Sequence, residues 1–290
     1  MLAISFLTLC AQPVGLVDTQ YQPERIYKLE EIHKHIEKDQ EDLLIVFDVD
    51  EVLITSKDAF IHPECDSIFM KILRREFAKA KTPEEKQKLE YCLSLSLLKP
   101  ERTLVEESTA SFIRHIQDLG IKTIALTSCP TGKLGLVPKI EHWRIDHLQK
   151  MGIDFSASFA SLDGSHFSEV PKKEVSFPDP LFEKGILFSY GYSKGEVLEA
   201  FLARMEWKPS KILFIDDLVE NHHSLDKHLK TLAIPFLGFH YLGAILPPER
   251  IDVNLIEFQF DHLMEYEEWL SDEAIHLMKN TTKKEVVDAH

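Results

Sequence analysis

The sequence predicts an α/β protein, a three-layer α/β/α sandwich around a mostly parallel, Rossmann-like sheet. Amphipathic segments alternate with apolar runs, and two of these segments end at Gly120 and Gly152 directly before such a run. This alternation of helix and strand is typical of a parallel sheet covered by helices on both faces. The apolar runs that we interpret as buried strands are residues 43–50, 121–128, 211–217 and 234–241, with a weaker fifth at 154–160.

The predicted core is interrupted by a helical insert. Roughly seventy residues separate the first strong strand from the second, more than one crossover helix needs. The helical pattern over residues 57–107 favours an inserted helical subdomain, with extra helices packed on the sheet as the alternative. The core domain then comprises residues 21–56 and 108–260, and residues 270–290 form a polar C-terminal tail.

Composition and charge restrict the partners. With 48 acidic and 33 basic residues the formal net charge is −15, which argues against a nucleic-acid or anionic-membrane surface. An anionic substrate would therefore need a locally positive pocket or a metal ion. The four cysteines show no C-x-x-C spacing, so they indicate neither a structural zinc site nor a disulfide framework.

The N-terminal segment, residues 1–20, has two interpretations. Residues 1–11 contain an apolar stretch of signal-peptide length, yet no Lys or Arg precedes it, and Leu9 fits a cleavage site poorly. A signal would place the protein in the periplasm or outside the cell, whereas an ordinary buried segment would leave it in the cytoplasm. No other segment is long and apolar enough for a transmembrane helix, so we expect no stable membrane insertion. The sequence leaves the oligomeric state open.

Polar side chains follow three of the four strong strands. Asp48 and Asp50 end the first, Thr127 ends the second, and Asp216 and Asp217 end the third. Because ligands bind at the carboxyl ends of the strands in an open parallel sheet, we expect these side chains to share one crevice. Four carboxylates there would repel each other unless a divalent cation neutralised them, and hard oxygen ligands favour Mg²⁺.

A lysine supplies a cation for the same crevice. The segment "SKGE" at 193–196 has the pattern of a capping box, with Ser193 as the N-cap and Glu196 as its partner. Lys194 then lies in the first helical turn, where its charge opposes the helix dipole and requires an anionic partner. Lys184, before the apolar run "GILFSY", is the competing candidate.

This set of residues suits phosphoryl transfer. An aspartate can attack phosphorus to form an aspartyl-phosphate, which water then cleaves. A second carboxylate two residues later can protonate the leaving oxygen and then deprotonate the water. Thr127 and Lys194 would hold and neutralise the phosphoryl oxygens.

The segments "IVFDVDEVL", "IALTS", "SKGEVLEAFL" and "ILFIDDLVEN" resemble, in this order, the four motifs of the haloacid dehalogenase (HAD) superfamily of phosphohydrolases. The predicted insert lies where that superfamily places a cap. The ending "IPFLGFHYLGA" is similar to an uncharacterised bacterial branch, the DUF2608 family.

The resemblance implies a role for each matching residue. Asp48 would be the nucleophile and a magnesium ligand, and Asp50 the acid/base with its backbone carbonyl as a second ligand. Thr127 would bind the phosphoryl group and Lys194 would balance charge. The pair Asp216 and Asp217 would complete the metal site, and which of the two binds the metal directly is left open. Asn221 would be an orienting residue of this site. Glu51 departs from the family pattern, which more often has a small or neutral residue there.

The resulting prediction is a Mg²⁺-dependent phosphatase that acts on a small phosphorylated substrate through an aspartyl-phosphate on Asp48. A cap that closes the crevice favours small soluble phosphomonoesters. One alternative is a catalytically weak HAD-like protein that binds a phosphorylated ligand or a protein partner, for which Glu51 is the best support. A phosphotransferase or mutase would use the same residues.

Overall fold

The computed structural model describes residues 21–36, 42–62, 65–172, 174, 177–205, 207–245 and 251–278. The predicted N-terminal segment, residues 1–20, lies outside the described residues, so neither interpretation of it is tested. The end of the predicted polar tail, residues 279–290, lies outside them as well.

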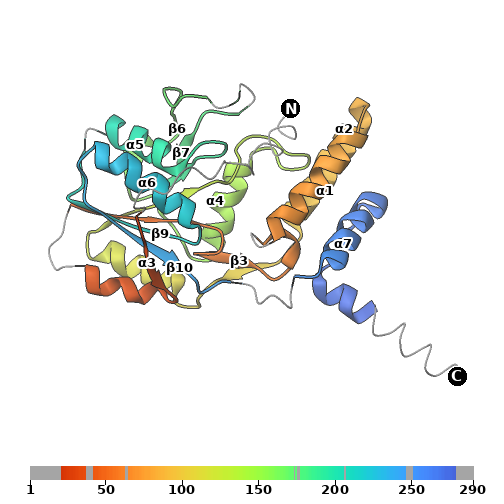
Figure 1. Ribbon diagram of the computed structural model, residues 1–290, viewed down its shortest axis with the longest axis horizontal. Coiled ribbons are helices and arrows are strands. Elements are labelled where there is room, and N and C mark those ends of the chain that lie inside the picture. The colour runs from red at the N-terminus through yellow and green to blue at the C-terminus, as the bar shows by residue number, and fades with distance from the viewer. Residues whose placement is uncertain are drawn as a thin grey trace, which may run out of the picture.

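An eight-stranded sheet forms the centre of the described chain (Figure 1). Its strands lie in the order β1 (Glu24–Ile26), β10 (Phe236–Tyr241), β9 (Lys211–Asp216), β2 (Leu43–Phe47), β5 (Lys122–Thr127), β8 (Ile186–Phe188), β7 (Leu181–Glu183) and β6 (Ser165–His166). The first six strands are parallel to their neighbours, and β7 and β6 continue the sheet antiparallel. The four strong strand predictions correspond to β2, β5, β9 and β10, and the predicted mostly parallel sheet is confirmed.

The sheet is buried on both faces, which produces the three predicted layers. Along β2, Leu43, Ile45 and Phe47 join one hydrophobic core, whereas Leu44 and Val46 join the other. This alternation follows from the two-residue period of a strand. The first core includes η2 (Leu29–His35), α3 (Thr109–Asp118) and α4 (Ile140–Lys150), and the second includes α5 (Lys194–Arg204) and α6 (Val219–Thr231). In Figure 1, α5 and α6 lie above the sheet and α3 lies below it.

The weak strand prediction at 154–160 is wrong. Phe155 is buried as predicted for an apolar run, but the backbone then turns and enters the short 3-10 helix η5 (Ala160–Leu162). The Asp154 carboxylate accepts a hydrogen bond from the backbone N–H of Ser156, which favours this turn over an extended chain. The strand beside β5 is instead β8, within the run "GILFSY".

A two-stranded antiparallel ladder, β3 (Ile54–Ser56) with β4 (Arg102–Leu104), brackets the helical insert. The chain leaves the core through β3 and returns through β4, so the insert is anchored at both ends. The Thr82 hydroxyl accepts a hydrogen bond from the N–H of Glu85, so the capping box predicted at residues 82–85 is present. In chain order the elements are β3 (Ile54–Ser56), η3 (Ala59–Ile61), α1 (Asp66–Lys79), α2 (Pro83–Leu98) and β4 (Arg102–Leu104).

The C-terminal part of the chain packs on this insert. Helix α7 (Val253–Tyr266) contacts α1, α2 and η3, and Leu263 forms a buried cluster with Cys92 and Leu95. Figure 1 shows α1, α2 and α7 side by side, at one end of the molecule. Residues 272–278 are helical as well, although they belong to the segment predicted as a polar tail. The structure thus places residues from both sides of the expected core boundary against the insert.

A buried carboxylate ties the two segments together. Asp58, at the start of the insert, accepts hydrogen bonds from the indole N–H of Trp269 at 2.9 Å and from the backbone N–H of Asp272 at 3.0 Å. In return, the Asp272 carboxylate accepts one from the N–H of Ala59 at 3.0 Å. These bonds satisfy backbone donors at the starts of two short helical segments, which fixes the C-terminal segment on the insert.

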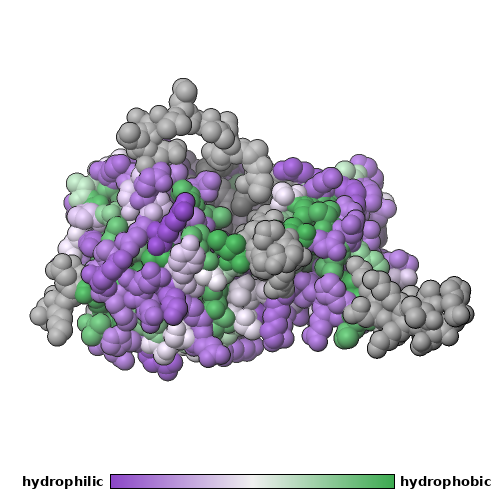
Figure 2. All heavy atoms as spheres, turned by 60° about the horizontal axis from the view of Figure 1, so that its bottom comes forward, coloured by the Kyte–Doolittle hydropathy of each residue, from purple (hydrophilic) through white to green (hydrophobic). Residues whose placement is uncertain are grey.

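The face in Figure 2 is mostly hydrophilic, with hydrophobic side chains gathered in smaller patches. Among the described residues, no helix combines the length and the hydropathy needed to cross a bilayer.

Replacing Asp58 tests this attachment. We expect Asp58→Ala to destabilise the protein by about 1–3 kcal/mol for each buried donor left without an acceptor. The free energy of unfolding from urea titration measures the effect. Asp118→Ala is the control, because Asp118 is exposed at the end of α3 and surface substitutions stay within about 0.5 kcal/mol. Equal losses in the two variants would contradict the attachment.

Candidate active site

Three adjacent parallel strands bring the predicted residues to one edge of the sheet. Strand β2 lies between β5 and β9, and Phe47 is in register with Ala125 and Ile215 on either side. The backbone N–H of Asp48 donates to the carbonyl of Ile215 at 2.8 Å, so Asp48 remains fixed to β9 just beyond the last residue of β2. The residues that follow these strands therefore meet, as the strand order requires.

Lys194 lies between two carboxylates. Its Nζ is 2.7 Å from Asp48 Oδ1 and 2.7 Å from Asp216 Oδ2, and its side chain is only 2% exposed. These are the anionic partners that the helix-dipole argument required. Lys184, the competing candidate, is instead half-exposed and forms an ion pair with Asp163.

Local sequence explains why Lys194 is placed here. Ser193 accepts a hydrogen bond from the N–H of Glu196 in the predicted capping box, which starts α5 at Lys194. Gly195 lets α5 approach α6, because a Cβ at this position would overlap the carbonyl oxygen of Ser224. The first turn of α5 can therefore bring the lysine under the ends of β2 and β9.

Asp216 is fully buried and its carboxylate is fully occupied. Oδ1 accepts hydrogen bonds from the backbone N–H of Leu218 at 2.8 Å and from the Asn221 amide at 2.9 Å. Oδ2 accepts from Lys194 and, at 3.1 Å, again from Asn221. Asn221, in the first turn of α6, therefore orients Asp216, which in turn holds Lys194.

Asp217 completes an acidic cluster. One carboxylate oxygen from each of Asp48, Asp216 and Asp217 can be chosen so that all three lie within 4.8 Å of one another. Burial raises the pKa of Asp48 to about 7, with Lys194 opposing the shift and Asp216 adding to it. Burial and the charges of Asp216 and Asp48 raise the pKa of Asp217 to about 9. Lys194 therefore does not balance the cluster, and the oxygen donors fit a hard divalent cation.

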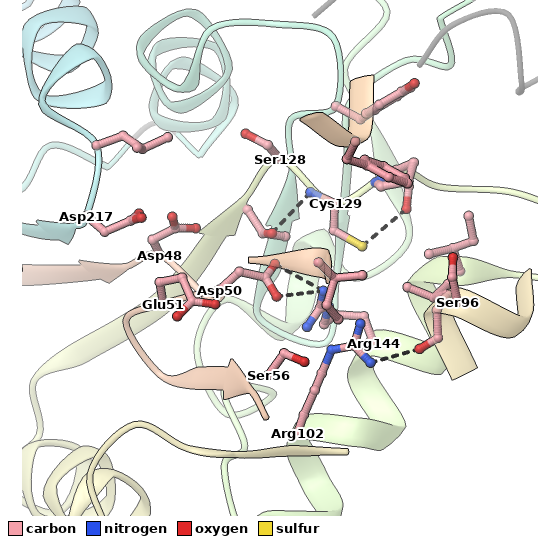
Figure 3. A pocket seen from close by; sticks show the side chains of 18 of the residues that line it. Asp48, Asp50, Glu51, Ser56, Ser96, Arg102, Ser128, Cys129, Arg144 and Asp217 are labelled. Atoms are coloured by element: carbon pink, nitrogen blue, oxygen red, sulfur yellow. Dashed lines mark hydrogen bonds and ion pairs between the residues drawn. The ribbon is translucent and has the colours of Figure 1, made fainter. Parts of the chain in front are cut away.

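The Asp50 side chain points to an arginine that the sequence analysis missed. Arg144 Nη2 lies 3.0 Å from each Asp50 oxygen (Figure 3). Arg144 is only 4% exposed on α4, between the buried residues Ile140 and Leu148. An arginine on the apolar face of an amphipathic helix requires a buried partner, and this was the signal for it in "KIEHWRIDHL".

Thr127 ends β5 and lines the same cavity as Asp48. Its hydroxyl oxygen accepts a hydrogen bond from the backbone N–H of Cys129 at 3.1 Å, which leaves the hydroxyl proton available to a ligand. Burial raises the pKa of the neighbouring Cys129 thiol, so this cysteine is not an activated nucleophile.

Glu51, the residue that departs from the family pattern, points away from the acidic cluster. Its backbone is in the left-handed region (φ 60°), and its side chain is buried. Glu51 Oε2 accepts a hydrogen bond from the Thr55 hydroxyl at 2.6 Å and lies 2.8 Å from His62 Nε2. Glu51 thus fastens the turn after β2 to the start of the insert.

A cavity of about 320 Å³ lies between the core and the insert. Asp48, Thr127, Lys194 and Asp217 line its core side. Its insert side is largely apolar and includes Ile61, Phe69, Met70, Leu93 and Leu97. The insert therefore covers the carboxyl edge of the sheet, where a cap would close over a substrate.

These features define a class of protein. A mostly parallel α/β core presents a lysine and three aspartates at the carboxyl edge of its sheet, beneath a helical insert. Within this class the chain belongs to the family described as "Protein of unknown function (DUF2608)", whose model matches residues 25–276. The predicted family is thus confirmed.

Relatives of the chain occur in several bacteria. An "Uncharacterized protein" of Rickettsia conorii is 30% identical over 217 residues, covering 72% of this chain and 71% of the relative. A "Putative outer membrane protein" of Chlamydia pneumoniae is 24% identical over 257 residues, covering 87% and 88%. The HAD domain of effector protein Lem4 from Legionella pneumophila shares 13% identity at a TM-score of 0.36, covering 81% of this chain and 97% of that domain. The last similarity is too distant to carry an argument.

The two lysines give a matched test of the buried ion pairs. We expect Lys194→Met to cost about 3–5 kcal/mol of unfolding free energy, because it leaves two buried carboxylates without their cation. Lys184→Met removes an exposed ion pair and should change stability by no more than about 1 kcal/mol. Chemical unfolding at pH 8 without divalent ions measures both. A loss for Lys194→Met no larger than that for Lys184→Met would refute the burial argument.

Proposed function

We propose that this protein is a Mg²⁺-dependent phosphatase that hydrolyses a small phosphomonoester through an aspartyl-phosphate on Asp48. The observation that carries the proposal is the position of Asp48. Its carboxylate lies at the core side of the covered cavity, against Lys194 and beside Asp217.

The two oxygens of Asp48 have different surroundings. Oδ1 accepts hydrogen bonds from the N–H of Val49 at 2.7 Å and from Lys194. No described residue donates to Oδ2, so this oxygen keeps its lone pairs for attack on phosphorus. The new O–P bond forms as the bond to the leaving oxygen breaks, and that oxygen takes up a proton. Water then attacks the phosphorus, which releases inorganic phosphate and restores Asp48.

Asp50 is the group proposed to move protons in both steps. Held by Arg144, its carboxylate accepts hydrogen bonds, and this arrangement suits the second step, in which water loses a proton. To donate a proton to the leaving oxygen, Asp50 must first carry one and turn from the guanidinium. Its side chain is 43% exposed, which gives it room to do so.

Asp48, Asp217 and the backbone carbonyl of Asp50 would hold the Mg²⁺ ion. Asp216 is less suited to direct contact, because both of its oxygens already accept hydrogen bonds from Lys194, Leu218 and Asn221. When bound, the ion would neutralise the acidic cluster and polarise a phosphoryl oxygen. Thr127 and Lys194 would contact the remaining phosphoryl oxygens.

A second candidate is a binding protein of the same fold that holds a phosphorylated ligand without turning it over. The ion pair between Asp50 and Arg144 favours it, because an Asp50 that stays on the guanidinium cannot donate a proton to the leaving oxygen. Glu51 no longer supports this candidate, since its carboxylate contacts Thr55 and His62.

Turnover of an aryl phosphate separates the two candidates. We expect hydrolysis of phenyl phosphate in the presence of Mg²⁺, its loss in EDTA, and a fall in kcat of at least about 10³-fold in Asp48→Asn. Asp118→Asn makes the same change at an exposed site and should keep full activity. Activity that survives both EDTA and Asp48→Asn would end the proposed mechanism. No activity on a broad panel of phosphate esters would favour the binding protein.

The adjacent aspartates of the cluster should respond differently to Mg²⁺. We expect Mg²⁺ to raise the thermal midpoint of the wild type, since a ligand of the folded state stabilises it. Asp217→Asn should raise the half-saturating Mg²⁺ concentration about tenfold or more through loss of a direct ligand. Asp216→Asn should chiefly lower stability without Mg²⁺, because Lys194 loses a partner. The reverse pattern would make Asp216 the direct ligand.

A further inference from the structure

A second charged group lies in the same cavity, apart from the acidic cluster. Arg144 from α4 and Arg102 from β4 both line the cavity, and neither belongs to the four sequence motifs. Figure 3 shows both arginines on the far side of Asp50 from Asp48 and Asp217. Their positions make them a candidate subsite for a part of the ligand other than its phosphoryl group.

Arg144 is buried but only partly paired. Its Nη2 bonds Asp50, whereas Nε and Nη1 have no hydrogen-bond partner among the described residues beyond the neighbouring Cys129 thiol, a weak acceptor. Buried polar atoms without partners are uncommon in native proteins and indicate a missing ligand or water. Nε and Nη1 of Arg144 can therefore donate hydrogen bonds to an acceptor bound in the cavity.

The two arginines on this side of the cavity differ in their partners. Asp50 pairs with Arg144, and Glu51 pairs with His62. Arg102 has no carboxylate within ion-pair distance among the residues that the structure describes; it donates to the carbonyl of Leu97 at 2.8 Å. Arg102 is thus a partly buried cation without a paired carboxylate among the described residues, and desolvating a charge is costly unless it is paired. Burial and the charge of Arg144 lower the pKa of Arg102 to about 10, and the charges of Asp50 and Glu51 oppose this shift only in part.

Trp143 holds the two guanidinium groups in place. The Cζ atoms of Arg102 and Arg144 lie 5.1 and 5.0 Å from the centre of its ring. Stacking of this kind fixes guanidinium planes while leaving their N–H groups free to bind. The two like charges on this ring repel each other and Asp50 bonds only Arg144, so a further anion beside them would be favourable.

We propose that Arg102 and Arg144 bind a carboxylate of the ligand, so that the substrate class is a small phosphomonoester that carries a carboxylate. Guanidinium N–H groups match a planar carboxylate, and its single negative charge would pair with Arg102, whereas a second phosphate would bring up to two charges to this one unpaired cation. A cavity of about 320 Å³ admits only a small molecule. The phosphoryl half of this ligand rests on the proposed function.

Binding of unreactive phosphonates tests this subsite without requiring turnover. Calorimetry with the full chain and Mg²⁺ would compare phenylphosphonate with its 2-, 3- and 4-carboxy derivatives. We expect at least one carboxylated isomer to bind about tenfold tighter or more, the usual worth of a charge-assisted pair. Three carboxylated isomers that bind no tighter than phenylphosphonate would overturn the proposal.

Variants assign the preference to Arg102. Arg102→Met should reduce the carboxylate preference about tenfold, and Arg102→Lys should keep part of it by retaining the charge. Arg204→Met is the matched control: Arg204 stacks on Phe167 and pairs with Glu169 but does not line the cavity, so the preference should persist. If Arg102→Met does not unfold cooperatively, Arg102→Gln replaces it. An unchanged preference in the methionine or glutamine variant would refute the subsite.

The two proposals fail in different ways. Carboxylate preference without hydrolysis of any phosphate ester would remove the phosphatase and keep the subsite. Hydrolysis of phenyl phosphate together with equal binding of all four phosphonates would do the opposite.

Discussion

The candidate site depends on one buried ammonium group, that of Lys194, held between Asp48 and Asp216. Taking three charges out of water is costly, and the cost is offset only when their geometry is good and the remaining lone pairs are satisfied. For Asp216, the Asn221 amide and the backbone N–H of Leu218 donate hydrogen bonds to these remaining lone pairs. The arrangement needs β2, β9, α5 and the start of α6 in place together, so forming the site and completing this half of the core are the same event.

Much of this could be predicted from the sequence, because the relevant signals are local. Four apolar runs had strand length, the helix starts carried capping boxes, and the carboxyl ends of parallel strands share one edge. The errors occurred where local signals compete. The apolar run at 154–160 is broken by a turn that Asp154 caps, and β8 (Ile186–Phe188) is too short to stand out as a strand. The residues at the carboxyl ends of the strands, by contrast, could be placed together without predicting the loops between them.

The features that the sequence did not reveal are long-range contacts. The pairing of Asp50 with Arg144 joins residues 94 positions apart, and no pattern in either segment specifies the other. Glu51 is the instructive case. From the sequence it was interpreted as an extra negative charge at the phosphate site. In the structure its backbone is left-handed and its carboxylate contacts Thr55 and His62, so it links the core to the insert. A single sequence cannot distinguish these roles, because both place a carboxylate directly after Asp50.

The attachment of the C-terminal segment to the insert has a consequence for how the protein is made. Asp58 leaves the ribosome 211 residues before its partner Trp269 and 214 residues before Asp272. Chains begin to fold from their N-terminal side during synthesis. All eight strands, with Lys194 and the three aspartates, are therefore available before α7 can pack on α1 and α2. The nascent protein can therefore assemble the acidic crevice and the insert first, and the contacts that fix the C-terminal segment on the insert form only later.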